Sequence, residues 1–292
     1  MRASKDKTRQ RARREAVAFW IFRAFAYLVV LFAAAVLIDI LIKGAPRINW
    51  AFLTQGPDPD DISKGGVFPA IAGTFYLVAG SIAIALPIGV FTAIYLSEYA
   101  RDTRFTRLVR ICITNLAGLP SIVFGLFGYA LFVMMFGLDK SLIAGCLTLM
   151  LMILPVIITA SEEALRAVPQ GFREGSLALG ATKWQSVRTN VLPYAMSGVF
   201  TGSILGVARV AGETAPIMFT AVAFTAGLPS SVFKPVEALT FYLYMVVTTT
   251  VQDYEKALPT AYGAALVLIV MVFGMNLLAM ILRAKLRKKY RW

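Results

Sequence analysis

An arginine and a glutamate stand four positions apart in a mostly apolar part of the chain. Arg209 and Glu213 belong to the segment Val-Ala-Arg-Val-Ala-Gly-Glu-Thr-Ala-Pro, residues 207–216. A spacing of four places two side chains on one face of a helix. A charged side chain at the centre of a bilayer costs at least about 2.5–3.5 kcal/mol on insertion scales, so it is rarely there without a role. The pair therefore predicts a polar site inside a membrane protein.

The residue types at this site are compatible with anion binding. A guanidinium group binds oxyanions through a rigid fork of N–H donors and stays charged at any relevant pH. Thr214 and Ser121 are candidate hydroxyl donors, and Asn115 is a further candidate for lining the path. Two interpretations stay open: an anion competes with Glu213 for Arg209 during transit, or the two charges form a purely structural ion pair between helices.

The composition indicates which elements position these residues. The chain has 292 residues, of which 58% are hydrophobic and 15% charged, whereas soluble domains carry about 25% charged residues. Roughly 20 apolar residues span the hydrocarbon core as a helix. The sequence thus predicts an all-α, polytopic membrane protein with six transmembrane helices, the first an uncleaved signal anchor. The predicted spans are Ala24–Ile42, Val67–Ser97, Ile111–Leu138, Ser141–Ser161, Val191–Val222 and Ala257–Leu282.

The basic residues are distributed unevenly over this topology. Of the 29 Lys and Arg residues, 21 fall on one side of the membrane and 6 on the other. Cytoplasmic loops carry the excess of Lys and Arg, so both termini are predicted to be cytoplasmic. A seventh span would export the basic C-terminal tail. Residues 223–256 are therefore predicted to form an external interfacial or re-entrant segment.

This reading divides the chain into three parts. Residues 1–64 hold the basic tail, the first span and an external loop; residues 65–284 form a core of five spans; residues 285–292 form a second basic tail. The net charge of +13 is explained by the topology and does not indicate nucleic-acid binding. With no histidine and only Cys112 and Cys146 in apolar spans, no metal site is expected.

The third span contains a cluster of residues that disturb helices. Asn115, Gly118, Pro120, Ser121 and Gly125 fall within three turns. A broken helix frees backbone groups that can line a cavity. Small residues equally allow helices to approach closely. Both interpretations of this cluster stay open.

A long loop between the fourth and fifth spans, residues 162–193, carries its own helix signals. Pro169 suits the first turn of a helix, and Gly180 suits its C-terminal cap. Thr182 and Gln185 have the spacing of a capping box for a second short helix. We expect a helix-turn-helix beneath the membrane with exposed apolar residues.

The loop resembles a known motif. From Glu174 it reads Glu-Gly-Ser, three residues, Gly, nine residues, Asn-Val-Leu-Pro. This is similar to the EAA motif of bacterial ABC importer permeases, Glu-Ala-Ala, three residues, Gly, nine residues, Ile-x-Leu-Pro; Asn190 departs from the isoleucine. The resemblance implies a coupling helix that docks into a groove on a separate ATPase subunit. The residues assigned to docking are Glu174, Gly175, Ser176, Gly180, Leu192 and Pro193.

Three further segments narrow the resemblance. Residues 93–100, 115–128 and 209–216 are similar to those of the phosphate-specific permeases, especially the PstA-type subunits. The resemblance implies a type I ABC importer permease fold in the bacterial inner membrane, with inorganic phosphate as cargo. It also implies a homologous permease in a heterodimer, two copies of an ABC ATPase and an external phosphate-binding protein.

The energy source is expected to lie in the partners. The chain has no Gly-x-x-x-x-Gly-Lys-[Ser/Thr] loop, so we expect no enzyme activity or cofactor of its own, and ATP and Mg²⁺ bound by the ATPase subunits. Alternatives are a permease for sulfate or molybdate, and an ion-coupled secondary carrier in which Asp39 or Glu213 titrates. A structural scaffold would not need Arg209 and Glu213 within the membrane.

Overall fold

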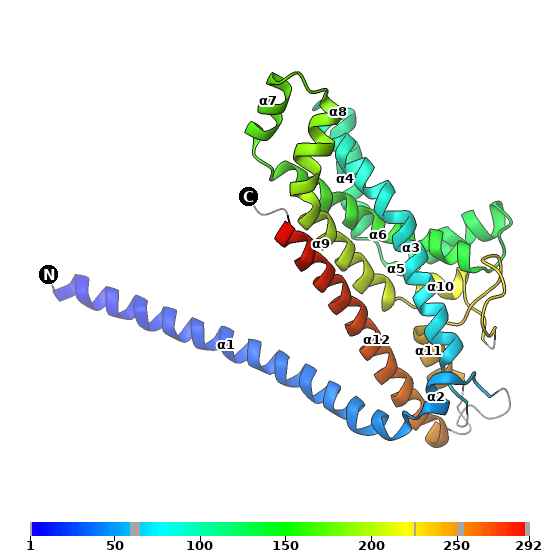
Figure 1. The fold of residues 1–292 in the computed structure, drawn as a ribbon. Coiled ribbons are helices and arrows are strands. Elements are labelled where there is room, and N and C mark those ends of the chain that lie inside the picture. The colour runs from blue at the N-terminus through cyan, green and yellow to red at the C-terminus, as the bar shows by residue number, and fades with distance from the viewer. Residues whose placement is uncertain (1, 59–64, 225, 250–253, 290–292) are drawn as a thin grey trace.

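The chain is built almost wholly from helices. The computed structural model describes residues 2–58, 65–224, 226–249 and 254–289 (Figure 1). Some residues of the predicted external loops and of the C-terminal tail lie outside the described residues, namely 59–64, 225, 250–253 and 290–292. Within the described ranges the only β pairing is an isolated bridge between Val222 and Val236. The helices are α1 Arg2–Gly44, α2 Trp50–Thr54, α3 Phe68–Ile94, α4 Arg104–Ala117, α5 Ser121–Gly128, α6 Leu142–Arg166, α7 Gln170–Ala178, α8 Lys183–Ser186, α9 Leu192–Ala211, α10 Ala215–Thr220, α11 Leu239–Thr249 and α12 Tyr254–Lys289.

The predicted all-α fold class with about six spans is confirmed. In the described part of the chain, five helical stretches are long and apolar enough to cross a membrane, and a bent pair of helices supplies a sixth if it counts as one span. Three π-helical turns interrupt the ends of longer helices: Tyr95–Tyr99 after α3, Tyr129–Met135 after α5, and Val187–Val191 before α9.

The predicted span Ile111–Leu138 contains a sharp break. Its residues form two helices, α4 and α5, which meet at an angle of 105°. Gly118 is the C-cap of α4, and Pro120 is the N-cap of α5. Proline lacks an N–H donor and disfavours the helical conformation in the residue before it, which ends α4 here. The helix is broken at this cluster, and Gly125 within the cluster also packs closely against another helix, so both features are observed.

The predicted span Val191–Val222 is also interrupted. Helix α9 ends at Ala211 with Gly212 as its C-cap, and the short α10 begins at Ala215. A continuous helix would require the carbonyl of Gly212 to accept from residue 216. Pro216 has no N–H to donate and its ring would clash with that carbonyl. The break therefore follows from the proline.

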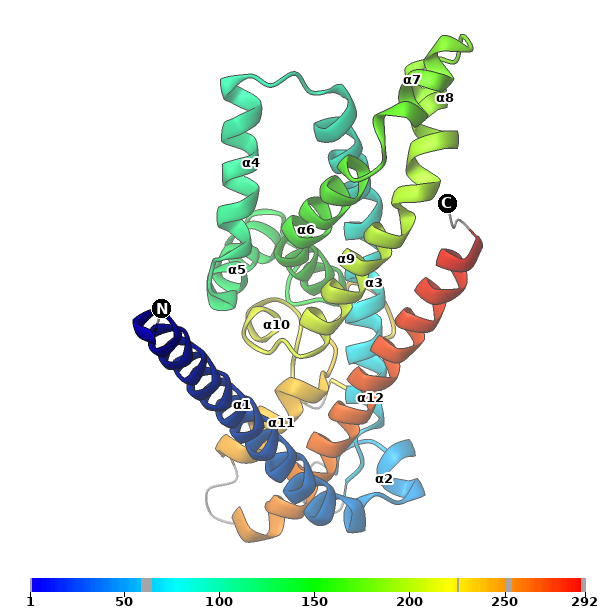
Figure 2. The same cartoon turned by 90° about the vertical axis from the view of Figure 1, so that its left-hand side faces the viewer.

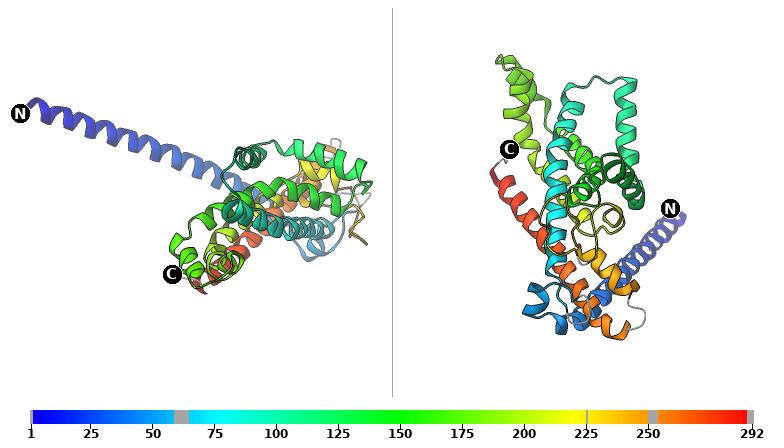
Figure 3. Two further views of the ribbon diagram at one scale, coloured as in Figure 1. Left: turned by 90° about the horizontal axis from the view of Figure 1, so that it is seen from above. Right: turned by 90° about the vertical axis from the view of Figure 1, so that its right-hand side faces the viewer.

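The core lies where α3, α6 and α9 pack together, with α12 alongside α9 (Figure 2). Leu149, Met152 and Ile153 of α6 are almost fully buried between these helices. Small residues allow the close approach: a Cβ at Gly202 of α9 would lie 2.7 Å from the Cβ of Ala160. In contrast, α1 leaves the bundle and touches mainly α12 near its own C-terminal end (Figure 3).

The region predicted as an external segment covers one end of this core. The backbone N–H of Leu142, at the start of α6, donates to the carbonyl of Lys234 at 2.9 Å. Helix α11 packs against α12 and α3, and Tyr242 within it is 1% exposed. At 11 residues, α11 is too short to cross a bilayer.

Candidate functional site

Two broken helices meet inside the bundle. Helices α5 and α10 pack against each other (Figure 2). They approach so closely that a Cβ on Gly125 would lie 2.9 Å from the Cα of Pro216. Ser121 stands one turn before Gly125, and Thr214 two residues before Pro216. The breaks between α4 and α5 and between α9 and α10 therefore belong to one junction.

Arg209 lies in the last turn of α9, next to this junction. Its side chain is half-buried. Throughout the described part of the chain, no residue accepts a hydrogen bond from its guanidinium group or forms an ion pair with it. Arg209 is therefore a partly buried cation that has no bonded partner among the described residues.

The predicted pairing of Arg209 with Glu213 is wrong. Helix α9 ends at Ala211, so Glu213 lies beyond the helix and not on the same helical face. The ion pairs among the described residues do not include these two. Instead, the main-chain carbonyl of Glu213 accepts a hydrogen bond from Thr240 Oγ1 at 2.8 Å. Neither a structural ion pair nor a resting pair that an anion displaces is present.

The other candidate polar residues divide into two groups. Ser121 and Thr214 are half-buried at the junction, each directly after a helix break. Asn115 is exposed on α4, on the far side of the 105° bend. Ser121 thus begins α5 and Thr214 precedes α10, two helices that pack against each other, whereas Asn115 lies on α4.

The predicted helix-turn-helix between α6 and α9 is confirmed in its local detail. Helix α7 starts after Pro169, and Gly180 follows it with a φ of +82°, a conformation that favours glycine. Thr182 and Gln185 form the predicted capping box at α8. The loop projects from the end of the bundle that also carries the α3–α4 connection (Figure 1).

The tip of this loop is both apolar and exposed. Leu179 is 90% exposed, and Leu177 and Trp184 are also exposed. Glu174, Gly175 and Gly180 share this exposed region. A helical hairpin with open apolar side chains is suited to a protein partner.

Three of the residues assigned to docking, Ser176, Leu192 and Pro193, do not lie at the exposed tip of the loop. Ser176 is 8% exposed and its hydroxyl bonds to that of Ser186, which holds α7 against α8. Leu192 and Pro193 form the first turn of α9, where Leu192 packs into the apolar cluster at the base of the loop. These three residues therefore position the loop.

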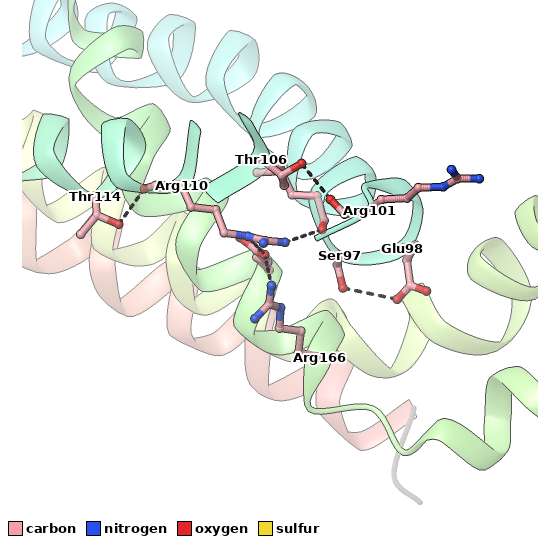
Figure 4. Close-up of polar contacts among 9 residues, drawn as sticks. Ser97, Glu98, Arg101, Thr106, Arg110, Thr114 and Arg166 are labelled. Atoms are coloured by element: carbon pink, nitrogen blue, oxygen red, sulfur yellow. Dashed lines mark hydrogen bonds and ion pairs between the residues drawn. The ribbon is translucent and has the colours of Figure 1, made fainter. Parts of the chain in front are cut away.

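A set of ion pairs that was not predicted from the sequence lies at the base of the loop. Arg173 of α7 bonds both carboxylate oxygens of Glu98, which belongs to the π-helical turn after α3. Glu162 of α6 accepts from both Arg110 of α4, at 2.9 Å, and Arg166, at 2.7 Å (Figure 4). Four of these five charges stand near the ends of predicted spans, and Arg173 lies in the predicted loop, but their pairing depends on tertiary contacts.

Comparison with known proteins identifies the family. Residues 85–292 match the family described as "Binding-protein-dependent transport system inner membrane component". The chain belongs to this family. Its members are membrane-embedded permease subunits, which agrees with the apolar helices and the exposed loop described above.

Several permeases are similar in sequence. A protein of Bacillus subtilis (strain 168), named "Probable ABC transporter permease protein YqgI", is 34% identical over 81% of this chain and 84% of its own length. The "Phosphate transport system permease protein PstA 1" of Mycobacterium tuberculosis (strain CDC 1551 / Oshkosh) is 37% identical over 80% and 75%. The "Phosphate transport system permease protein PstA" of Haemophilus influenzae (strain ATCC 51907 / DSM 11121 / KW20 / Rd) is 33% identical over 83% and 84%.

Solved permease structures share the fold at low identity. A chain of a bacterial alginate ABC transporter, in complex with its alginate-bound periplasmic protein, superposes with a TM-score of 0.64 and 11% identity, covering 93% of this chain and 96% of that one. A chain of the inward-facing MetNI methionine ABC transporter gives 0.55 and 20%, covering 76% and 94%. The permease therefore has the type I ABC importer fold.

Proposed function

We propose that this chain is the transmembrane permease subunit of an ATP-driven importer of inorganic phosphate. The observation that carries the proposal is Arg209, a half-buried arginine with no partner in the described chain, beside two broken helices. The PstA relatives, 33–37% identical to this chain, support phosphate as the anion. Helix breaks inside transporters are a common place for substrate sites, because they free polar backbone groups.

The proposed role of Arg209 is to bind phosphate transiently. Its guanidinium fork matches two phosphate oxygens and adds a full positive charge in a region of low dielectric. Ser121 and Thr214, at the same junction, are the proposed hydroxyl donors. Glu213 is close in sequence and repels the anion, so that binding stays weak enough for release. Asn115 is proposed to line the path on the α4 arm.

The proposed energy source is a pair of separate ABC ATPase subunits, which bind ATP and Mg²⁺. The exposed loop around Glu174 and Leu179 is the proposed docking element. ATP-driven closure of the ATPases moves the loops and switches the permease between outward-open and inward-open states. A homologous permease completes the path as the second half of a heterodimer, and an external binding protein delivers phosphate. With the loop on the ATPase side, both termini are cytoplasmic.

The experiment that tests this function is uptake of labelled phosphate into cells lacking their own high-affinity system. The chain is co-expressed with its partner permease, ATPase and binding protein, alongside an ATPase-dead complex. We expect ATP-dependent phosphate uptake that excess sulfate and molybdate do not inhibit. Uptake that survives ATPase inactivation would contradict the proposal in favour of a secondary carrier. ATP-dependent uptake of sulfate or molybdate, but not phosphate, would retain the fold and change the substrate.

A further inference from the structure

Arg173 connects three elements at the base of the exposed loop. It lies in α7, and its Nη2 donates to Glu98 Oε1 and to the carbonyl of Leu165, each at 2.7 Å. Its Nη1 donates to the carbonyl of Val168, also at 2.7 Å. The Arg173 side chain is 20% exposed and that of Glu98 only 6%. One guanidinium group thus fastens α7 to the end of α6 and to the turn after α3.

Glu98 belongs to a segment that is held from a second side. The π-helical turn Tyr95–Tyr99 follows α3 without a break. Arg110 of α4 donates to the carbonyl of Leu96 in this turn at 2.7 Å and also pairs with Glu162 of α6 (Figure 4). π-Helical turns occur frequently at functional sites. Arg110 of α4 and Arg173 of α7 therefore both form hydrogen bonds to this turn.

The Arg173–Glu98 pair borders a cavity. This cavity, of about 430 Å³, is lined by Ser97, Glu98, Arg166, Gln170, Arg173 and Glu174. Beside it α7 contacts the turn after α3 through this ion pair, whereas an apolar side chain of α7 contacts α9: the ring of Phe172 packs on that of Tyr194, with centroids 4.8 Å apart. Displacement of α7 therefore reaches α9 through apolar packing and α3 through the ion pair.

Movement of α3 matters to the whole permease. Helix α3 packs along α6, and both line the core beside α9. Because packed cores transmit displacement rather than absorbing it, a pull on Glu98 shifts the α3–α6 pair as one body.

We propose that the Arg173–Glu98 pair is the link that passes ATPase-driven movement of the exposed loop to α3. This inference rests on the proposed function, because it assumes a partner that moves the loop. Arg173 and Glu98 act as positioning residues and do not touch the anion.

The test separates ATP hydrolysis from transport in the assembled complex. The complex of this chain with its partner permease and ATPase is purified and reconstituted in vesicles with the binding protein; phosphate uptake and ATP hydrolysis are measured in parallel. The variants are Arg173→Lys, which keeps the charge but loses the fork, Glu98→Gln, and the reversed pair Glu98→Arg with Arg173→Glu. The control is Arg107→Gln, whose ion pair with Asp102 is 3.7 Å long and exposed.

We expect Arg173→Lys and Glu98→Gln to lower uptake about tenfold, the usual size of a coupling effect, while ATP hydrolysis changes less than about twofold. The ATP hydrolysed per phosphate imported therefore rises. The reversed pair recovers part of the uptake, and Arg107→Gln leaves both rates unchanged. Equal losses of hydrolysis and uptake, or loss of assembly in the charge-conserving Arg173→Lys variant, would overturn the inference, as would unchanged uptake. If the unaltered complex shows no ATP-driven phosphate uptake, the proposed function itself fails.

Discussion

The arginines of this permease occupy two contrasting environments. At the loop base, Arg173 and Arg110 direct their N–H groups at carboxylates and main-chain carbonyls. At the junction of the broken helices, Arg209 has no such partner among the described residues. A partly buried arginine that is fully bonded holds elements together, whereas one left unbonded lowers stability unless a ligand completes it. The loop base, which is proposed to transmit movement, therefore differs from the proposed phosphate-binding site in how its arginines are bonded.

Replacing the unbonded arginine is expected to give the largest effect on transport. Arg209→Ala removes the two proposed charge-assisted hydrogen bonds to phosphate, so uptake is expected to fall at least about 100-fold. Assembly of the complex stays intact, because no described residue depends on this side chain. Arg209→Lys, which keeps the charge but not the fork, retains part of the uptake. Normal phosphate uptake by an assembled Arg209→Ala complex would show that Arg209 is not needed for transport, so it would no longer differ in role from the bonded arginines.

The contact between the two broken helices is the next most sensitive point. In Gly125→Ala the new Cβ meets the Cα of Pro216 at 2.9 Å, which pushes α5 and α10 apart and is expected to lower uptake about tenfold. Gly274→Ala in α12 is the matched control, because no atom lies within 4 Å of its added Cβ. Phosphate uptake by the two variants is compared at equal expression. Equal phosphate uptake by the two variants would show that transport does not depend on the close contact between α5 and α10.

The bonded arginines predict a loss of stability rather than of binding. Glu162→Ala leaves Arg110 and Arg166 without their shared carboxylate, and the pair is partly screened by solvent, so a loss of about 1–2 kcal/mol in the free energy of unfolding is expected. Asp102→Ala, at an exposed ion pair, is expected to cost less than about 0.5 kcal/mol. Denaturant unfolding of the detergent-solubilised chain measures both. A loss as small as that of Asp102→Ala would show that the Glu162 network contributes no more than a surface pair.

The smallest expected effect depends on pH and concerns a buried carboxylate that has no cation partner among the described residues. Glu237, in the connection between α10 and α11, is 2% exposed and accepts a hydrogen bond from the Gly227 N–H at 3.3 Å. Burial raises the pKa of Glu237 above its ordinary value, although the Gly227 hydrogen bond opposes this. Between the two pKa values the folded protein holds a proton that the unfolded chain has lost, so the free energy of unfolding falls as pH rises.

Glu237→Gln removes this ionisation. The variant is expected to unfold a few degrees higher than the unaltered protein at about pH 8 and to match it at about pH 4, where both states are protonated. Midpoint temperatures of the solubilised protein at the two pH values provide the measurement. A difference that stays constant with pH would show that Glu237 titrates alike in both states.

Much of this architecture follows from local sequence rules, and the remainder depends on contacts between distant segments. The loop helices were predictable because Gly180 and the Thr182–Gln185 capping box act within a few residues. The break at Pro120 was one of two open interpretations, since proline and glycine do not by themselves fix a bend. The pairing of Arg209 with Glu213 was predicted from helical spacing, and it failed because Pro216 ends the helix before Glu213.

The ion pairs at the loop base could not be predicted from spacing. Glu98 and Arg173 are 75 residues apart, and Arg110 and Glu162 are 52 apart. Their contacts exist because α3, α4, α6 and α7 converge at one end of the bundle, which is a property of the packed fold. Sequence charge counts placed these residues on one side of the membrane but did not pair them.

The position of α1 has a consequence for how the protein is made. Lys43 at its C-terminal end bonds the hydroxyl of Tyr262, 219 residues later, and a Cβ at Gly44 would lie 2.6 Å from the Tyr262 carbonyl oxygen. The rest of α1 is exposed along its apolar length. Because α1 packs mainly against α12, it can reach this position only after α12 has been synthesised. The first and last helices of the chain therefore complete the assembly together, and a chain truncated before α12 lacks the main contact of its first helix.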